Sequence, residues 1–137
     1  MLHRDAKIEL LKRVPLFSAC SKKELGQVAL AADEIDVREG KVLTAEGDPG
    51  REFFVLVEGS ADVRRKGRKV NTMGPGDFFG EIALVSDRPR TATVTVTSPA
   101  RLLVVTDRAF RELMKRVPSI QLKVMATLVE RLPADAF

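Results

Sequence analysis

The sequence has no tryptophan, no tyrosine, one histidine and one cysteine among its 137 residues. The histidine, His3, lies near the N-terminus, where chains usually fray. A catalytic triad, a Cys–His pair and a histidine-rich metal site all need a positioned imidazole, so the composition argues against each of them. Cys20 has no partner for an internal disulfide, which fits a reducing compartment. We therefore expect no enzyme activity, no catalytic cofactor and no metal site.

Long apolar runs are also missing. No stretch approaches the roughly 20 apolar residues that a membrane span needs, and the first residues lack the core of a signal peptide. We expect a cytoplasmic protein without a membrane span, folded as a single domain over residues 1–137. The net charge of +4 suits a small anionic ligand, but by itself it is too small to indicate a nucleic-acid-binding protein.

Helical patterns stand at both ends of the chain. Apolar residues at helical spacing predict one helix before Pro15, and a capping box from Ser21 to Glu24 predicts the start of a second. Near the other end, residues 107–132 predict two further helices, separated by Pro118. We expect residues 1–32 and 107–132 to be helical.

Between these helices, residues 33–106 break into short strand-like runs separated by glycine or proline, as in a sandwich or barrel. Some runs alternate apolar and polar residues, and one, Phe53 to Val57, is apolar throughout. The only helical interruption that we expect in this region lies within residues 77–94. The pattern predicts an α+β, mainly β fold.

Residues 77–94 contain one position that requires an anion. From Arg90 onward the chain alternates, so that Arg90 shares a strand face with Ala92 and Val94. If that face is buried, the guanidinium needs a counter-ion, because an unpaired buried charge is too costly. Upstream, Gly80 allows close backbone approach at the start of a short turn whose first N–H groups are free to bind an oxyanion. Together these features predict a phosphate site.

The segment Phe-Gly-Glu-Ile-Ala-Leu, followed after a short loop by Pro-Arg-Thr-Ala-Thr-Val, resembles the phosphate-binding cassette of the cyclic nucleotide-binding domain family. That family includes catabolite-activator-type regulators, cyclic-nucleotide-dependent protein kinases and nucleotide-gated channels. The resemblance extends over roughly residues 8–132, through Gly47-Asp48, Glu58-Gly59 and the Gly74 to Asp77 turn. It implies an eight-stranded antiparallel β-roll or jelly roll over residues 33–106, with a short cassette helix inside it.

The resemblance also implies the ligand contacts. Arg90 would clamp the cyclic phosphate beside the backbone N–H groups of Ile82 and Ala83, and Glu81 would accept a hydrogen bond from the ribose 2′-hydroxyl. Taken without the cassette, Glu81 reads as a solvated carboxylate and Arg90 as a surface arginine displaced by a bulge. The expected ligand-binding residues are Phe79, Gly80, Glu81, Ile82, Ala83, Arg90, Thr91 and Ala92.

The identity of the base stays open. Thr91 carries a hydroxyl that some family members use with cyclic GMP, but bacterial cyclic AMP binders carry a hydroxyl there too, and a strand threonine needs no ligand. Because the chain looks bacterial in type, cyclic AMP is the expected ligand and cyclic GMP the alternative.

By the same resemblance, the last helix would close over the base as a lid and signal to an effector protein. The candidate lid residues are Leu128, Val129, Arg131 and Leu132. We expect a monomer or weak homodimer with no DNA-binding domain, since few residues follow Leu132. The alternatives are an excised ligand-binding domain of a catabolite-activator-type transcription regulator and an interaction scaffold that keeps the fold without the ligand.

Residues 64–69 read Arg-Arg-Lys-Gly-Arg-Lys, which predicts a hairpin tip with five cations. Such tips are usually only solvated. The other readings are an acidic partner, a membrane surface or nucleic acid.

Overall fold

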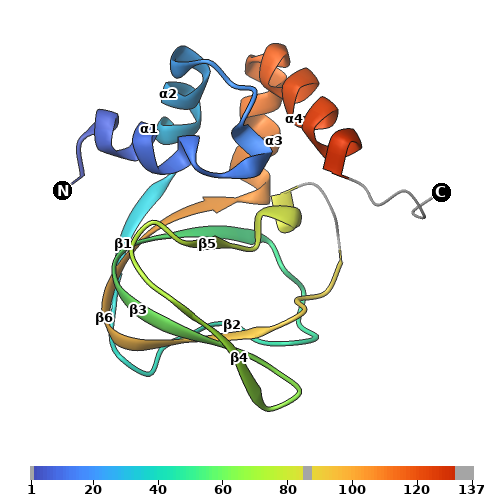
Figure 1. The fold of residues 1–137 in the computed structure, drawn as a ribbon. Coiled ribbons are helices and arrows are strands. Elements are labelled where there is room, and N and C mark those ends of the chain that lie inside the picture. The colour runs from blue at the N-terminus through green and yellow to red at the C-terminus, as the bar shows by residue number, and fades with distance from the viewer. Residues whose placement is uncertain (1, 85–87, 132–137) are drawn as a thin grey trace.

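The computed structural model describes residues 2–84 and 88–131. Within these ranges four α-helices gather at one end of the molecule, above a curved antiparallel sheet (Figure 1). The helical segments at this end are α1 Arg4–Lys12, the 3₁₀ turn η1 Pro15–Phe17, α2 Lys22–Leu30, α3 Asp107–Arg116 and α4 Pro118–Arg131. The predicted helical regions at both ends are confirmed. None of the described helices is long and apolar enough to cross a membrane.

The capping box predicted at Ser21 is present. The Ser21 hydroxyl accepts a hydrogen bond from the Glu24 N–H at 3.1 Å, and the Glu24 carboxylate accepts one from the Ser21 N–H at 2.8 Å. These two bonds satisfy donors that a helix start otherwise leaves unpaired, so they fix where α2 begins.

The mainly antiparallel β fold is confirmed, but the sheet has six strands in the described part of the chain, so the expected count of eight is not confirmed. The strands are β1 Asp33–Val37, β2 Val42–Thr44, β3 Glu52–Arg65, β4 Arg68–Met73, β5 Phe78–Phe79 and β6 Thr93–Thr106. Their order is β1-β6-β3-β4, with β2 paired to β6 and β5 to β3.

The count falls because two pairs of expected strands are continuous. The sequence has separate strand-like runs at 53–57, 61–63, 92–96 and 102–105. In the structure the first two lie in the single strand β3, and the last two lie in β6, which starts at Thr93 rather than Ala92. Register shifts between β3 and β6 lie around Gly59, whose φ is 95°. Bulges and a glycine with positive φ let a strand bend without ending, so β3 bends at this point while it stays paired with β6.

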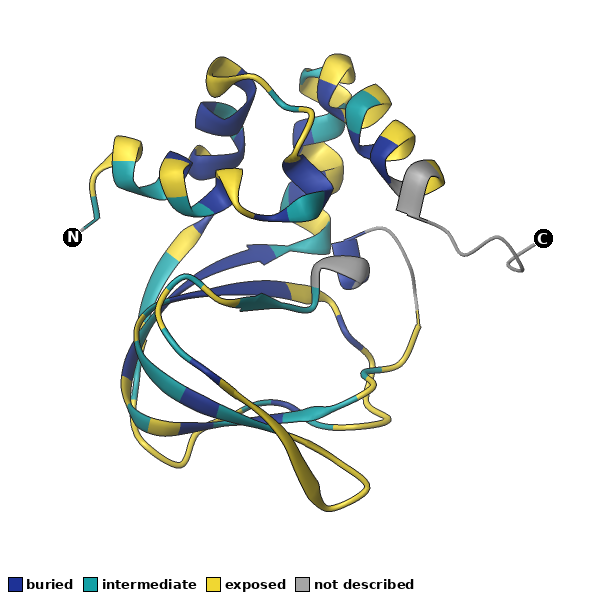
Figure 2. Cartoon of the chain, in the orientation of Figure 1, coloured by how far each residue is buried: buried dark blue, intermediate teal, exposed yellow. Residues whose placement is uncertain are grey.

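Strand β3 separates two apolar cores. Phe53 and Val55 pack in a larger core together with buried residues of all four helices, whereas Phe54 and Leu56 pack in a smaller core with residues of β6. Successive side chains of a strand point to opposite faces, so a strand buried on both sides is apolar throughout. This explains the unbroken apolar run seen in the sequence (Figure 2).

Candidate functional site

Arg90 lies in an extended segment just before β6, and its backbone is held by the loop that joins β2 to β3. Its N–H donates to the Asp48 carbonyl and its carbonyl accepts from the Gly47 N–H, both at 2.8 Å. The half-buried side chain turns back toward the start of β3, where Nη2 donates to the Glu52 carbonyl oxygen at 2.5 Å. The guanidinium is therefore held by main-chain groups.

Two glycines make room for this guanidinium. A Cβ atom on Gly80 would lie 2.3 Å from Arg90 Nη1 and 2.8 Å from the Glu52 carbonyl oxygen. A Cβ on Gly50 would lie 2.5 Å from Arg90 Nε. Any other residue at either position would displace the arginine. Gly80 was predicted to allow close backbone approach to a phosphate, whereas its contact with the guanidinium was not predicted. The contact of Gly50 was also missed, because Gly50 lies 40 positions from Arg90 in the sequence.

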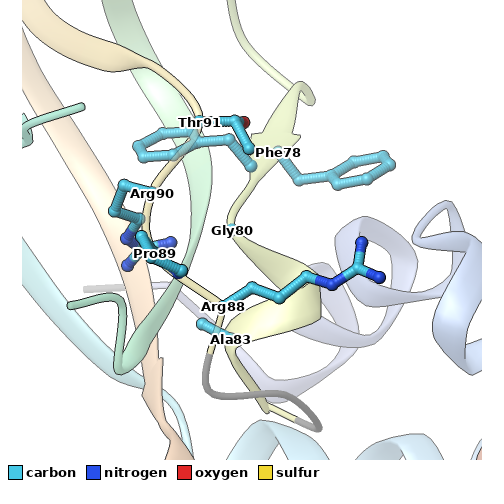
Figure 3. Close-up of a pocket in the computed structure, with 8 residues that line it drawn as sticks. Phe78, Gly80, Ala83, Arg88, Pro89, Arg90 and Thr91 are labelled. Atoms are coloured by element: carbon cyan, nitrogen blue, oxygen red, sulfur yellow. The ribbon is translucent and has the colours of Figure 1, made fainter. Parts of the chain in front are cut away.

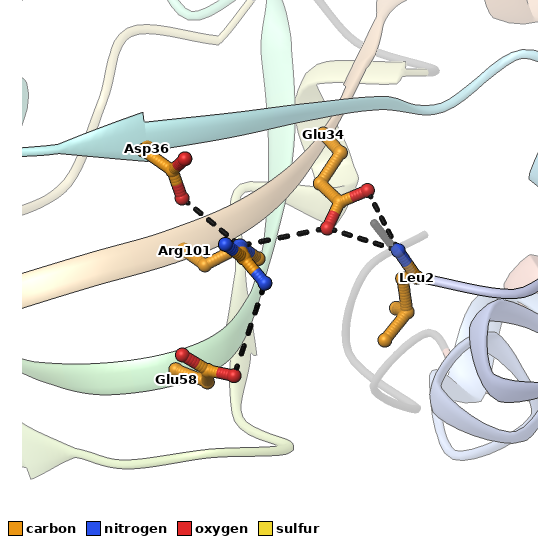
Figure 4. A network of polar contacts seen from close by, with 5 residues as sticks. All are labelled: Leu2, Glu34, Asp36, Glu58 and Arg101. Atoms are coloured by element: carbon orange, nitrogen blue, oxygen red, sulfur yellow. Dashed lines mark hydrogen bonds and ion pairs between the residues drawn. The ribbon is translucent and has the colours of Figure 1, made fainter.

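A comparison with Arg101 shows what is unusual about Arg90. Arg101 on β6 has Asp36, Glu34 and Glu58 at 2.9, 3.5 and 3.9 Å, and Glu34 also accepts from the Leu2 N–H (Figure 4). Hydrogen bonding to Asp36 raises the pKa of Arg101. Such a set of acidic neighbours is what a structural arginine in the sheet needs.

Arg90 has no such set. Among residues whose side chains the structure describes, none forms a salt bridge with it. Burial lowers the pKa of Arg90, although the Glu52 carboxylate opposes the shift from a distance. An arginine stays charged in a protein, so this site presents a partly desolvated cation that an anion would stabilise.

The turn after β5 forms the opposite wall of the site. Phe78 and Phe79 pair with Val55 and Phe54 of β3, and the rings of Phe54 and Phe79 stack with centroids 4.9 Å apart. Gly80 then turns the chain with a φ of 81°. The expected cassette helix is the four-residue 3₁₀ turn η2, Glu81–Leu84.

A cavity of about 330 Å³ opens between these two segments (Figure 3). This volume lies at the lower end of the range for small-molecule sites. The residues that line it are Phe78, Phe79, Gly80, Ala83, Arg88, Pro89, Arg90 and Thr91.

The structure thus brings together five of the predicted ligand-binding residues, namely Phe79, Gly80, Ala83, Arg90 and Thr91. Ala92 does not line the cavity, and its carbonyl accepts from the Thr44 hydroxyl at 3.2 Å. The side chains of Glu81 and Ile82 are outside the described part, so their roles stay predictions. Phe78, Arg88 and Pro89 also line the cavity and were not predicted.

No residue of α4 lines the cavity in the described part of the chain. Of the predicted lid residues, Val129 is 66% exposed, the side chains of Leu128 and Arg131 are not described, and Leu132 lies outside the described residues. Helix α4 instead packs on the helical end, where Ile120 and Val124 are buried in the larger core.

A buried carboxylate holds α4 in that place. Glu24 on α2 is 6% exposed and accepts hydrogen bonds from the Ser119 hydroxyl at 2.6 Å and from the Lys123 ammonium. Burial alone would raise the pKa of Glu24, but the bonds from Lys123, Ser119 and Ser21 outweigh it and lower that pKa to about 2. The sequence predicted Glu24 as a capping residue and missed this second contact with α4.

The sequence profile of the cyclic nucleotide-binding domain matches residues 34–117. The chain is 39% identical over 118 residues to a cAMP-dependent protein kinase regulatory subunit of Mycosarcoma maydis, covering 77% of this chain and 22% of that protein. It is 31% identical over 127 residues to the regulatory subunit of Dictyostelium discoideum, covering 87% and 39%.

Among solved structures, the chain is similar to the N-terminal domain of a transcriptional regulator from Streptomyces coelicolor A3(2), with a TM-score of 0.81 and 28% identity over 89% of this chain and 91% of that one. The chain spans between 22% and 39% of the length of the two curated relatives. The similarity to those relatives therefore concerns one part of longer proteins.

Proposed function

The chain belongs to the cyclic nucleotide-binding domain family, and we propose that it is a sensor whose cassette cavity binds cyclic AMP without turning it over. The observation that carries this proposal is the Arg90 guanidinium, fixed between Gly50 and Gly80 at the wall of the cavity with no acidic partner described. A planar fork of donors suits two oxygens of one phosphate, so the cyclic phosphate would supply the missing anion.

The ribose would lie over the cassette turn. Here Glu81 would accept a hydrogen bond from the 2′-hydroxyl, and the N–H of Ile82 would face the phosphate. The predicted phosphate contact from Ala83 would compete with an existing bond, because its N–H donates to the Gly80 carbonyl at 3.0 Å. That N–H would reach a phosphate only by sharing its hydrogen or by opening the 3₁₀ turn.

Replacing Glu81 by alanine should weaken the binding of cyclic AMP more than that of its 2′-deoxy analogue. Only the ribonucleotide offers the hydroxyl that the carboxylate would accept, and a hydrogen bond to a charged group contributes about 1.5 to 3 kcal/mol. Displacement of a fluorescent cyclic AMP analogue by each ligand measures the two losses. Equal losses for the two ligands would show that Glu81 serves the fold of the turn instead.

Cyclic AMP is proposed over cyclic GMP because the kinase subunits that resemble this chain are named as cAMP-dependent. Thr91 keeps cyclic GMP as the alternative, since it is exposed and lines the cavity, where its hydroxyl could meet a purine. The same displacement assay with cyclic GMP and with a Thr91→Ala variant separates the two. Preference for cyclic GMP that disappears in the variant would reverse the assignment.

For the output, we propose that α4 exchanges its place on α2 for a place over the bound base. The contact between Glu24 and the first turns of α4 would then hold the helix back until ligand competes for it. A ligand shifts such an equilibrium only as far as it prefers one state, so a weaker hold should tighten binding.

Glu24→Gln should have two effects. At neutral pH it should lower the free energy of unfolding by on the order of 2 kcal/mol, because it removes a charged hydrogen-bond acceptor. It should also raise the affinity for cyclic AMP several-fold, since α4 is released. Because the pKa of Glu24 is lowered from 4.5 to about 2, its stabilising effect is complete above pH 4.5 and is lost as pH falls toward 2. Urea unfolding at a series of pH values measures this loss.

The matched control is Glu112→Gln on α3, which removes an exposed carboxylate that pairs with Lys115 at 3.6 Å. This variant should change neither the stability at low pH nor the affinity. A stability difference for Glu24→Gln that stays constant down to pH 2 would contradict the ion pair. Unchanged or weaker cyclic AMP binding in that variant would contradict the movement of α4.

The alternative is that this chain is the excised sensor domain of a transcription regulator. The similarity to the N-terminal domain of the Streptomyces regulator over 91% of that chain favours it. In either case the same cavity binds the ligand, and the effector would read the position of α4.

A further inference from the structure

The hairpin that joins β3 to β4 carries five cations on six residues. It projects from the sheet at the end opposite the helices (Figure 1). Arg64, Arg65, Lys66, Arg68 and Lys69 are all exposed, and the turn is made by Lys66 and Gly67, with φ values of 51° and 76°. Two central residues with positive φ are typical of the tight turns that suit a twisted two-stranded ribbon.

This tip brings like charges together. Arg65 lies directly opposite Arg68, and Arg64 lies opposite Lys69. Like charges in directly opposed positions destabilise a β ladder. Within the described residues, Lys69 has a salt bridge with Asp62 at 3.4 Å, whereas the other four cations have none. The fold alone does not account for this concentration of unpaired charge.

The tip is nevertheless held in place. The Glu46 carboxylate, from the loop that also holds Arg90, accepts a hydrogen bond from the Lys66 N–H at 2.8 Å. The Glu46 N–H in turn donates to the Thr93 hydroxyl at 2.9 Å. The cations therefore extend from a turn whose backbone is anchored to the sheet, which lowers the entropy lost when they meet a partner.

The two charged pairs lie on opposite faces of the ribbon. Successive side chains alternate between faces, so Arg64 and Lys69 share one face and Arg65 and Arg68 share the other. A flat anionic surface would contact only one of these faces. A groove between two rows of phosphates would contact both, and the major groove of B-DNA, about 12 Å wide, admits a two-stranded ribbon. Residues 64–69 also include no apolar side chain for insertion into a bilayer.

We propose that this hairpin binds double-stranded DNA through the phosphates on both walls of the major groove, without reading sequence. The site is separate from the cassette and does not depend on cyclic nucleotide binding. Contacts of this kind release counterions, so affinity should fall steeply with salt. A plot of log K against log[salt] should have a slope of about −0.9 for each phosphate neutralised. The dissociation constant should lie between about 10⁻⁴ and 10⁻⁶ M, as for other sequence-independent binding.

The test is fluorescence anisotropy of a labelled DNA duplex of about 20 base pairs, titrated with the full chain at several salt concentrations without cyclic nucleotide. The test variant carries Arg64→Gln, Arg65→Gln and Arg68→Gln and keeps Lys66 because of its positive φ. The matched control carries Lys12→Gln, Lys22→Gln and Arg108→Gln, which remove the same charge from exposed positions at the helical end. Thermal unfolding shows that both variants are folded.

We expect the hairpin variant to bind the duplex at least tenfold more weakly. The plot of log K against log[salt] should also become less steep, by about 0.9 for each of the three cations removed. The affinity of the control should stay within about threefold of the original chain. Equal weakening in the two variants would overturn the proposal, since net charge alone would explain it. No binding by the original chain would also overturn it. Hairpin-dependent binding to phosphatidylserine vesicles or to polyglutamate, but not to the duplex, would assign the surface to a membrane or an acidic protein.

Discussion

Arg90→Ala is expected to weaken cyclic AMP binding at least a hundredfold, which corresponds to about 3 kcal/mol. The cyclic phosphate would then face a cavity wall without its cation. Arg90→Lys should lose nearly as much, because an ammonium cannot donate to the Glu52 carbonyl and to two phosphate oxygens in the planar geometry of a guanidinium. Isothermal titration of each variant measures the loss.

Arg101→Ala is the matched control for this prediction. It removes an arginine of the same sheet whose neighbours are carboxylates and which does not line the cavity. Its binding of cyclic AMP should therefore stay within about twofold of the original chain, even if the loss of these exposed ion pairs lowers its stability slightly. Affinity that survives in Arg90→Ala, or falls equally in the two variants, would show that Arg90 does not bind the phosphate.

Gly80→Ala is expected to lower both stability and affinity. The added methyl group would lie 2.3 Å from Arg90 Nη1 and 2.8 Å from the Glu52 carbonyl oxygen, and the φ of 81° is strained for alanine. Backbone strain of this kind costs about 1 to 3 kcal/mol. Because the guanidinium must move, cyclic AMP binding should weaken by at least tenfold beyond the effect on folding. Urea unfolding and ligand titration measure the two losses separately.

Gly40→Ala is the control that separates the effect of backbone strain from the effect of the contact with Arg90. Gly40 has a similar φ of 89°, but a Cβ atom there would meet nothing within 4 Å. This variant should lose about as much stability from strain and keep its affinity. If both glycine variants kept their affinity, the contact between Gly80 and Arg90 would have no part in binding.

Much of the candidate site could be predicted because it is local in the sequence. Gly80 and Arg90 stand ten residues apart within one segment, where glycine freedom and strand alternation already indicate an anion. The expectation of an inward-facing strand face is confirmed for Val94, which is buried, whereas Ala92 is only partly buried and lies before β6. Arg90 itself precedes the strand, and the Asp48 and Gly47 backbone groups, not a ladder position within β6, fix its direction.

The parts that were missed depend on contacts between distant segments. Gly50 packs on Arg90, Glu46 caps the hairpin turn, and Glu24 binds α4 across 95 residues of sequence. No periodicity or motif near these residues indicates such partners. The expected strand count was not confirmed for a related reason, since a glycine such as Gly59 ends a strand in some folds and bends it in others.

Isothermal titration of the 137-residue chain with cyclic AMP tests the central claim most directly, with 5′-AMP as the non-cyclic control. We predict saturable binding of one cyclic AMP per chain and binding of 5′-AMP at least a hundredfold weaker. We expect weaker binding of 5′-AMP because its phosphate carries more charge than the cyclic phosphate and would lose more hydration on entering the cavity beside Arg90. A folded chain that binds neither cyclic AMP nor cyclic GMP would contradict the account and would leave an interaction scaffold that keeps the cassette without its ligand.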